Sequence, residues 1–160
     1  MGLSKSIMCR LAHQHETMAE LIDGFSEEQV KQRVIDGKWS AFENVVHLVS
    51  YQPVFIDRLA QIAKGNQPFF DRYVAENDPL FYAYLQKSIP DLMHIAGGDR
   101  SFIQDYLSQL RPDQLRQKGL HAKFGAMTVT QWADLFLLHE AHHLWTMVQL
   151  VSILRVSLPG

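Results

Sequence analysis

The chain has 160 residues, 47% of them hydrophobic and 20% charged, with a formal net charge of −2 at pH 7. This length suits one domain over residues 1–160, and the charge balance leaves no cationic excess to bind a nucleic-acid backbone. A single cysteine, Cys9, excludes an internal disulfide and a cysteine-rich zinc module, which is typical of a cytoplasmic protein, and no apolar run approaches the roughly 20 residues of a membrane span.

The first predicted helix covers residues 3–22. Its apolar residues recur at helical spacing, and the Asp-Gly pair at 23–24 ends it. A Ser-x-x-Gln pattern at 26–29 then predicts a short helical turn.

A second long helix is predicted to begin at Ser40. Ser40 and Glu43 have the spacing of a capping box, in which each side chain satisfies a free amide of the first turn. The helix should continue to about Lys64, and Pro53 should kink it or remove one backbone hydrogen bond.

An aromatic insert follows at 67–84, and its role is left open by the sequence. Residues 67–77 are predicted as a loop, after which an Asp-Pro pair opens a short helix over 80–87. The third long helix is expected over 88–110, where Gly97-Gly98 should bend it or let another backbone approach closely.

The last predicted helix runs from a capping box at 128–131 to about residue 154. The long connection before it, 111–127, contains an irregular hairpin-like loop at 119–126, but no stretch alternates with a period of two for long enough to predict a sheet. Four helices, each about 30–37 Å long at 1.5 Å per residue, therefore predict an all-α fold, a four-helix bundle.

Histidine is the unusual residue of this chain, with eight copies, three of them between 139 and 143. One core-facing stripe of the last helix is formed by Trp132, Phe136, His139, His143, Met147, Leu150 and Leu154. An unpaired imidazole in a core costs about 1–3 kcal/mol, whereas two imidazoles at i and i+4 can share one cation. His142 points about 100° away around the helix and is excluded as a ligand. The remaining histidines have no partner at useful spacing: His13, His15, His94 and His121.

His47 is the best candidate for a third ligand. It lies two turns into its helix, so it reaches the depth of the histidine pair if both helices enter the core from the same end of the bundle. Three neutral imidazoles with open positions are typical of a catalytic metal site. Glu43 is a candidate to orient a ring nitrogen, although its capping role already accounts for it. Tyr51 and Arg58 share a face with His47, and Arg58 is either a carboxylate anchor or a solvated side chain.

Residues 139–143 also satisfy the zinc-protease pattern H-E-x-x-H, in which Glu140 would be the general base. That interpretation lacks a third ligand, because residues 144–160 contain no Asp, Glu or His, and it lacks the sheet edge along which proteases bind peptide. Glu140 with His143 resembles half of a di-iron site, but the second Glu-x-x-His is absent. Three roles are left open for Glu140: to hold a ligand, to serve as a base, or simply to face outward.

A resemblance to a known family rests on the Lys-Trp-Ser run at 38–40, on His47 followed by leucine, on the Gly-Ala-Met-Thr run at 125–128 and on His139-x-x-x-His143. Together these motifs resemble the DinB-like (YfiT-like) superfamily of four-helix proteins. The resemblance implies a metal site of His47, His139 and His143, with zinc or nickel as the divalent ion. It also implies a bacterial, cytoplasmic, often dimeric protein, in a superfamily that includes thiol transferases using bacillithiol or mycothiol and a mycothiol-dependent maleylpyruvate isomerase.

Two functions follow as hypotheses. The first is a metal-dependent enzyme of thiol S-transferase or hydrolase type, in which the cation lowers the pKa of a bound water or thiol. Its substrate would be a small molecule, with a low-molecular-weight thiol as one candidate, and its catalytic base is not identified. The alternative is a non-enzymatic helical homodimer in which the histidine site is structural or sensory, with a closed fourth position or no solvent path.

Overall fold

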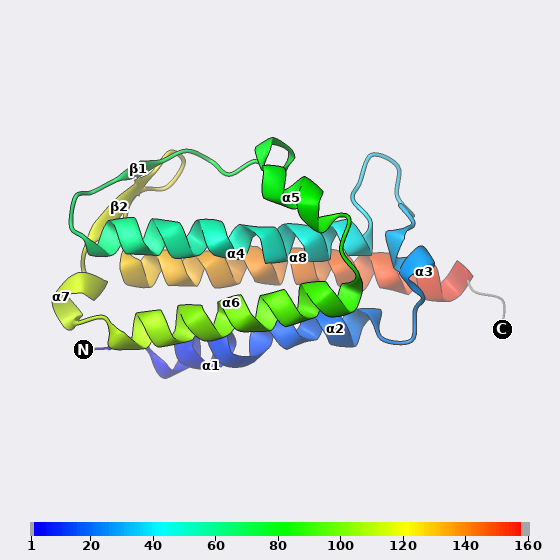
Figure 1. Cartoon of the computed structure of the whole chain (residues 1–160), viewed down its shortest axis with the longest axis horizontal. Coiled ribbons are helices and arrows are strands. Elements are labelled where there is room, and N and C mark those ends of the chain that lie inside the picture. Colours follow the sequence, from blue (N-terminus) through cyan, green and yellow to red (C-terminus); the bar gives the residue numbers. More distant parts are fainter. Residues whose placement is uncertain (1, 158–160) are drawn as a thin grey trace.

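The computed structural model describes residues 2–157, and it forms a four-helix bundle with a small sheet at one end (Figure 1). The α-helices are α1 (Lys5–His13), α2 (Thr17–Ile22), α3 (Glu27–Lys31), α4 (Ala41–Ala63), α5 (Pro79–Tyr84), α6 (Ile89–Gln109), α7 (Pro112–Leu115) and α8 (Val129–Ser157). Two 3₁₀ turns, η1 (Gln14–Glu16) and η2 (Ala75–Asn77), and three strands, β1 (Phe69–Phe70), β2 (Lys118–His121) and β3 (Gly125–Thr128), complete it. The predicted four-helix bundle is confirmed.

The bundle consists of α4, α6, α8 and the pair α1 and α2. Helix α4 contacts both α8 and α6, while α1 contacts α6 and α8 on the other side. In Figure 1, α4 and α6 run in one direction and α1, α2 and α8 run in the other. No helix in residues 2–157 combines the length and apolarity needed to cross a membrane.

The predicted capping boxes form at both histidine-bearing helices. At the start of α4, the Glu43 amide donates to Ser40 Oγ at 3.1 Å, and the Ser40 amide donates to Glu43 Oε2 at 2.8 Å. At the start of α8, the Thr128 amide donates to Gln131 Oε1 at 2.9 Å, and the Gln131 amide donates to Thr128 Oγ1 at 3.3 Å. These local bonds start each helix at the residue that the sequence predicts.

The first predicted helix is broken, in contrast to the continuous helix expected over 3–22. The backbone tightens into η1 between α1 and α2, with His13 at φ −126° and ψ −22°. At this break, the Gln14 side chain donates to the Leu137 carbonyl at 2.8 Å and to Glu140 Oε1 at 2.9 Å. The break therefore places a polar side chain against the middle of α8, a contact that local periodicity does not reveal.

Helix α6 continues without a break through Gly97 and Gly98. A Cβ added at either glycine would meet no atom of the described chain within 4 Å, so no backbone approaches closely there. Helix α4 continues through Pro53, which has no N–H and so removes one backbone hydrogen bond of the helix, the second of the two predicted outcomes.

The sheet is the main departure from the all-α prediction. Strand β1 pairs in parallel with β2, and β2 pairs antiparallel with β3, so the hairpin predicted loosely at 119–126 gains a third strand from the aromatic insert. Strands of two to four residues are too short to show an alternating pattern. A Cβ at Gly119 would lie 2.7 Å from Ile62 Cγ1, so the sheet packs on the end of α4 at a distance that only glycine permits.

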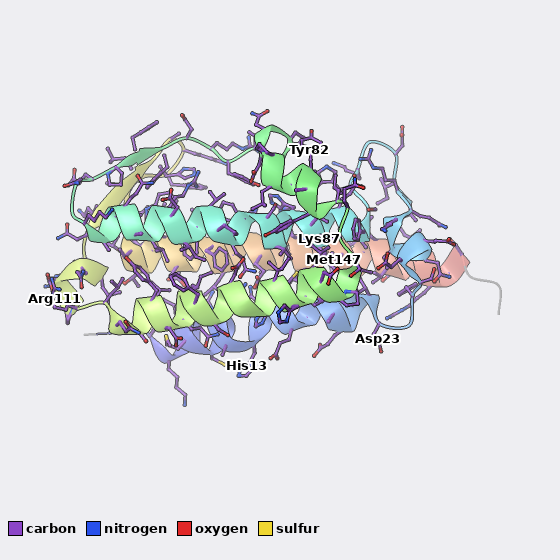
Figure 2. All side chains as sticks on the ribbon, in the orientation of Figure 1. His13, Asp23, Tyr82, Lys87, Arg111 and Met147 are labelled. Atoms are coloured by element: carbon purple, nitrogen blue, oxygen red, sulfur yellow. The ribbon has the colours of Figure 1, made fainter. Side chains whose placement is uncertain are left out.

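The apolar core has two parts separated by a polar layer at mid-bundle. One cluster includes Val45 and Met147, and the other includes Phe55 and Phe136. Figure 2 shows Met147 pointing between the helices, whereas Tyr82 lies on the outer surface, with 53% of its area exposed. The buried polar side chains between the two clusters lie near the centres of α4, α6 and α8 and include Gln52, His47, Arg100 and Glu140. The candidate site belongs to this layer.

Candidate functional site

Three histidines from two helices meet at the polar layer. His47 comes from α4, and His139 and His143 come from successive turns of α8. Their ring centroids are 4.4–4.9 Å apart, and each ring offers a nitrogen within 4.8 Å of the others. Among residues 2–157, this is the one group of three or more His, Cys, Asp or Glu side chains close enough to hold a metal ion. The predicted trio is therefore brought together.

Helices α4 and α8, which carry the three histidines, run in opposite directions (Figure 1). Three ring pairs join α4 to α8: His47 with His143, Tyr51 with His139, and Phe55 with Phe136, the last stacked at 4.2 Å between ring centroids. Residue numbers therefore rise along α4 as they fall along α8. This pairing requires antiparallel helices, so the condition under which His47 was selected, entry of both helices from the same end, is not met. The depths still match because α8 extends well past the start of α4 (Figure 1).

All three imidazoles are held in their neutral form. Burial, and then the neighbouring imidazoles, lower the pKa of His47, His139 and His143 to about 3 in each case. A neutral imidazole keeps one nitrogen lone pair, which is the form that binds a metal.

Asn44 determines which nitrogen of His143 carries the proton. Its Nδ2 donates to the Ser40 carbonyl at 2.8 Å, so its Oδ1 faces His143 Nδ1, also at 2.8 Å. Because that oxygen can only accept, His143 Nδ1 donates, and His143 Nε2 is left with a lone pair. Asn44 was not predicted from the sequence, where Glu43 was the candidate for orienting a ring nitrogen.

The other two rings are incompletely satisfied. His47 Nε2 and His139 Nε2 face each other at 3.0 Å, and one proton at most can lie between them. The Nδ1 atoms of both rings are buried and have no hydrogen-bond partner among the described residues. Buried nitrogens without a partner are costly in a core, and two Nε2 atoms this close can share one cation through their lone pairs. The donor set therefore fits a divalent metal.

The aromatic insert forms one wall of this site. Tyr73 packs on His47 at 5.7 Å, and Phe81 stacks on Trp39 at 5.4 Å between ring centroids. Trp39 in turn contacts His47 at 5.1 Å. The insert at 67–84, whose role the sequence left open, thus shapes the surroundings of the histidines.

A cavity of about 500 Å³ opens beside the three histidines. Tyr51 and Tyr73 line it near the rings, and the β2–β3 hairpin covers another side through His121, Lys123 and Phe124. A volume of this size accommodates a small molecule beside the imidazoles. The cluster is therefore reachable from solvent.

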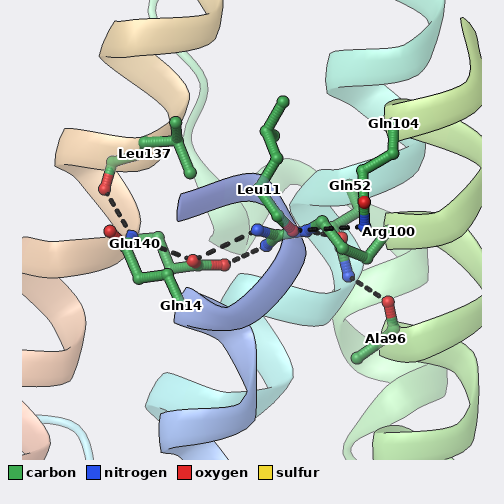
Figure 3. A network of polar contacts seen from close by, with 8 residues as sticks. All are labelled: Leu11, Gln14, Gln52, Ala96, Arg100, Gln104, Leu137 and Glu140. Carbon is green, nitrogen blue, oxygen red and sulfur yellow. Dashed lines mark hydrogen bonds and ion pairs between the residues drawn. The ribbon is translucent and has the colours of Figure 1, made fainter. Parts of the chain in front are cut away.

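Glu140 has a role different from those considered for it. It is 2% exposed, so it does not face outward, and it forms an ion pair with the fully buried Arg100. Gln14 also donates to Glu140, and Gln52 Oε1 accepts from Arg100 Nε at 3.1 Å (Figure 3). Since both carboxylate oxygens are engaged away from the histidines, the zinc-protease and di-iron interpretations lose their carboxylate.

Of the other residues weighed from the sequence, Glu43 and His142 are placed as expected, whereas Arg58 and His121 are not. Glu43 combines its capping bond with an ion pair to Arg33 and does not orient a histidine. Arg58 is 8% exposed, so it is not a solvated arginine. His142 is exposed at the rim of the cavity and stays outside the cluster. His121, given no role in the sequence analysis, lines the cavity because the hairpin folds over it.

The acid sensitivity of folding is expected to depend on His15. Burial, and then the charge of Arg100, lower the pKa of His15 from 6.5 to about 4. Between these values the unfolded chain binds a proton at His15 and the folded chain does not, so stability falls as the pH drops through this window. Wild type should therefore lose stability relative to His15→Gln between pH 7 and pH 4.5, measured by urea unfolding. His13→Gln, at an exposed histidine, is the control. If the difference in free energy of unfolding between wild type and His15→Gln stayed the same across this pH range, the expectation would be contradicted.

Comparison with known proteins gives a family and a fold. The sequence matches the DinB superfamily over residues 10–147. YfiT from Bacillus subtilis, described as a probable metal-dependent hydrolase with an unusual four-helix bundle topology, superposes with a TM-score of 0.75 at 15% identity, covering 99% of this chain and 92% of that one. The four-helix bundle protein TT2238 gives a TM-score of 0.65 at 15% identity, covering 89% and 95% of the two chains.

A DinB-like protein, YjoA from Bacillus subtilis, gives a TM-score of 0.62 at 20% identity, covering 98% of this chain and 96% of that one. No curated protein matches the sequence. At these identities the solved structures establish the four-helix fold.

Proposed function

Since the chain belongs to the DinB superfamily, we propose that it is a metal-dependent enzyme in which His47, His139 and His143 hold one divalent cation, zinc or nickel. The proposal rests mainly on the convergence of three neutral imidazoles at the wall of an open cavity. A structural zinc site is usually closed by four protein ligands, whereas three histidines beside a cavity leave a position for substrate or water. YfiT, whose fold is similar, is described as a probable metal-dependent hydrolase.

A bound cation would lower the pKa of a water or thiol and so supply a nucleophile at neutral pH. The residues of this chain have separate roles around it. Asn44 accepts from His143 Nδ1 and directs the opposite nitrogen toward the cluster. Trp39, Tyr51 and Tyr73 surround the rings with apolar surface, which limits water at the reacting group and strengthens electrostatic interactions there.

The reaction we propose is a hydrolysis or a thiol S-transfer on a small molecule, with a low-molecular-weight thiol as one candidate reactant. The cavity of about 500 Å³ matches substrates of that size. We further propose that the protein acts as a homodimer in the cytoplasm.

Metal analysis of protein purified without a polyhistidine tag tests the proposal. We expect one divalent ion per chain in the wild type and its loss in His143→Ala. Absence of stoichiometric metal in the wild type would refute the metal site. Turnover is then sought by screening thiols and electrophiles with the loaded protein.

A second function, a structural or sensory histidine site, is favoured by one observation. Glu43 and Glu140, the acidic residues nearest in sequence to the ligands, are both engaged in ion pairs and neither is free to act as a base. Turnover of an electrophile with a cellular thiol would count against this alternative, and metal binding without any turnover would favour it.

Replacing Asn44 with leucine is expected to weaken metal binding by about 10–100-fold. Leucine keeps the volume of the side chain but removes the oxygen that orients His143 and fixes its tautomer. Calorimetric titration with zinc measures the change. Ser50→Ala is a control, because Ser50 is also buried on α4 but its hydroxyl donates to the His47 carbonyl and not to a ring. Equal zinc affinity in Asn44→Leu and wild type would show that Asn44 does not orient the ligand.

A further inference from the structure

Two arginines are buried within residues 2–157, and they differ in whether a carboxylate pairs with them. Arg100 is fully buried and paired with Glu140. Arg58 is 8% exposed, and no carboxylate of residues 2–157 forms an ion pair with it. Its guanidinium donates instead to the Tyr51 hydroxyl at 3.3 Å and to the Asp71 carbonyl at 2.9 Å. These are neutral acceptors, so the buried positive charge is solvated but not neutralised.

Aromatic rings enclose the guanidinium of Arg58. Its central carbon lies 5.2 Å from the ring centroid of Phe70, 5.7 Å from that of Trp132 and 5.9 Å from that of Tyr51. Ring faces attract a cation, but they also keep water away from it. A buried charge without a counter-charge is unfavourable, and natural proteins seldom keep one unless a ligand supplies the opposite charge.

The unpaired guanidinium lies at the cavity that the histidines share. Arg58 lines this cavity together with His47, His139 and His143. The Tyr51 ring centroid is 5.1 Å from that of His139, and the Tyr51 hydroxyl accepts from Arg58. One tyrosine side chain therefore separates the cation from the histidine cluster, a span that a small molecule can bridge.

His121, which packs on Trp132 as Arg58 does, provides a second donor. His121 Nδ1 accepts from the amides of Lys123 at 3.0 Å and Phe124 at 3.3 Å, so a neutral His121 carries its proton on Nε2. The cavity is also lined by Arg72 and Lys123, and Glu76 is its only acidic lining residue among those described. Its walls thus present positive charge and N–H donors, the complement of an oxyanion.

We propose that this cavity binds a small molecule bearing a carboxylate, and that Arg58 pairs with that carboxylate and so sets specificity. One carboxylate would neutralise the single positive charge of Arg58. The planar guanidinium can also donate two parallel hydrogen bonds to a planar carboxylate. The position of the reacting group at the histidines rests on the proposed metal-dependent function, whereas the carboxylate site does not. Arg58 is a binding residue, and no chemical step is assigned to it.

The experiment compares a matched pair of probes, 3-phenylpropionate and its neutral amide 3-phenylpropionamide, by calorimetry on the full chain, both zinc-loaded and chelator-treated. We expect wild type to bind the carboxylate at least about tenfold more tightly than the amide, the effect of one charge-assisted pair. Arg58→Met should abolish this preference, and Arg58→Lys should retain part of it. Arg116→Met removes one positive charge from an exposed residue outside the cavity and should leave the preference unchanged.

Thermal unfolding, measured without and with the carboxylate probe, separates an effect on binding from an effect on folding. Arg58→Met should be at least as stable as wild type, because it removes an uncompensated buried charge, and 3-phenylpropionate should raise the melting temperature of wild type but not of Arg58→Met. Equal binding of the two probes by wild type, or an unchanged preference in Arg58→Met, would overturn the proposal. A carboxylate preference in protein that binds no zinc would support the carboxylate site while refuting the proposed metal function.

Discussion

Replacing Arg100 with methionine is expected to lower the free energy of unfolding by about 3–5 kcal/mol. The substitution leaves the Glu140 carboxylate at 2% exposure with only Gln14 donating to it, and an isolated buried carboxylate is strongly unfavourable. Gln52 Oε1 also loses the donor that it has in Arg100 Nε. Urea unfolding followed by circular dichroism measures the change.

The double variant Arg100→Met with Glu140→Met is the matched control. Removing both charges leaves no unpaired ion, so we expect the double variant to regain most of the lost stability. A double variant as unstable as Arg100→Met would mean that the loss comes from packing around α6 and not from an unpaired carboxylate. The network in Figure 3 links α1, α4, α6 and α8, so it favours one arrangement of the four helices.

Removal of the metal is the second large effect that we expect. A ligand that binds only the folded state stabilises it by about 4 kcal/mol at a free concentration of 1,000 times its Kd. Chelator treatment of the zinc-loaded protein should therefore lower the free energy of unfolding by about that amount under matching conditions. His139→Ala, which lacks one of the three proposed ligands, should show no response to zinc. Thermal and urea unfolding with and without zinc provide the measurement.

His142→Ala is the control for this prediction. His142 lies on the same helix and next to His143 in sequence, but it is exposed and outside the cluster. Zinc should stabilise His142→Ala as much as wild type. Loss of the zinc response in His142→Ala, or a full response in His139→Ala, would contradict the proposed ligand set.

The histidine cluster was predictable because helical spacing is a local property. His139 and His143 are four residues apart, so any α-helix places them on one face, and the core-facing stripe around them indicates that this face is buried. His47 was selected by its depth in the second helix, and it does join the pair, although α4 and α8 are antiparallel. His47 was therefore chosen correctly, although the relative direction of the two helices was not. The depth of a residue in the bundle depends on where each helix begins and ends, and the connections between the helices determine that.

The partners of the cluster were harder to predict. Asn44 lies three residues before His47 and reaches His143, which belongs to another helix. A single asparagine in a helix has no sequence signal that distinguishes a buried hydrogen bond from a solvated side chain. Glu140 shows the same limit, because its pairing with Arg100 involves residues 40 positions apart in the chain.

The helix starts, the helix periods and the i, i+4 histidine pair could all be read from the sequence, because each depends on interactions within a few residues of chain. Other features are decided only by the tertiary structure. They are the break at η1, the three-stranded sheet, the antiparallel pairing of α4 and α8, and the presence of an ion pair at Arg100 but not at Arg58. These features depend on which distant segments exclude water from one another, and burial is what gives a charge or an imidazole its chemical role in this protein.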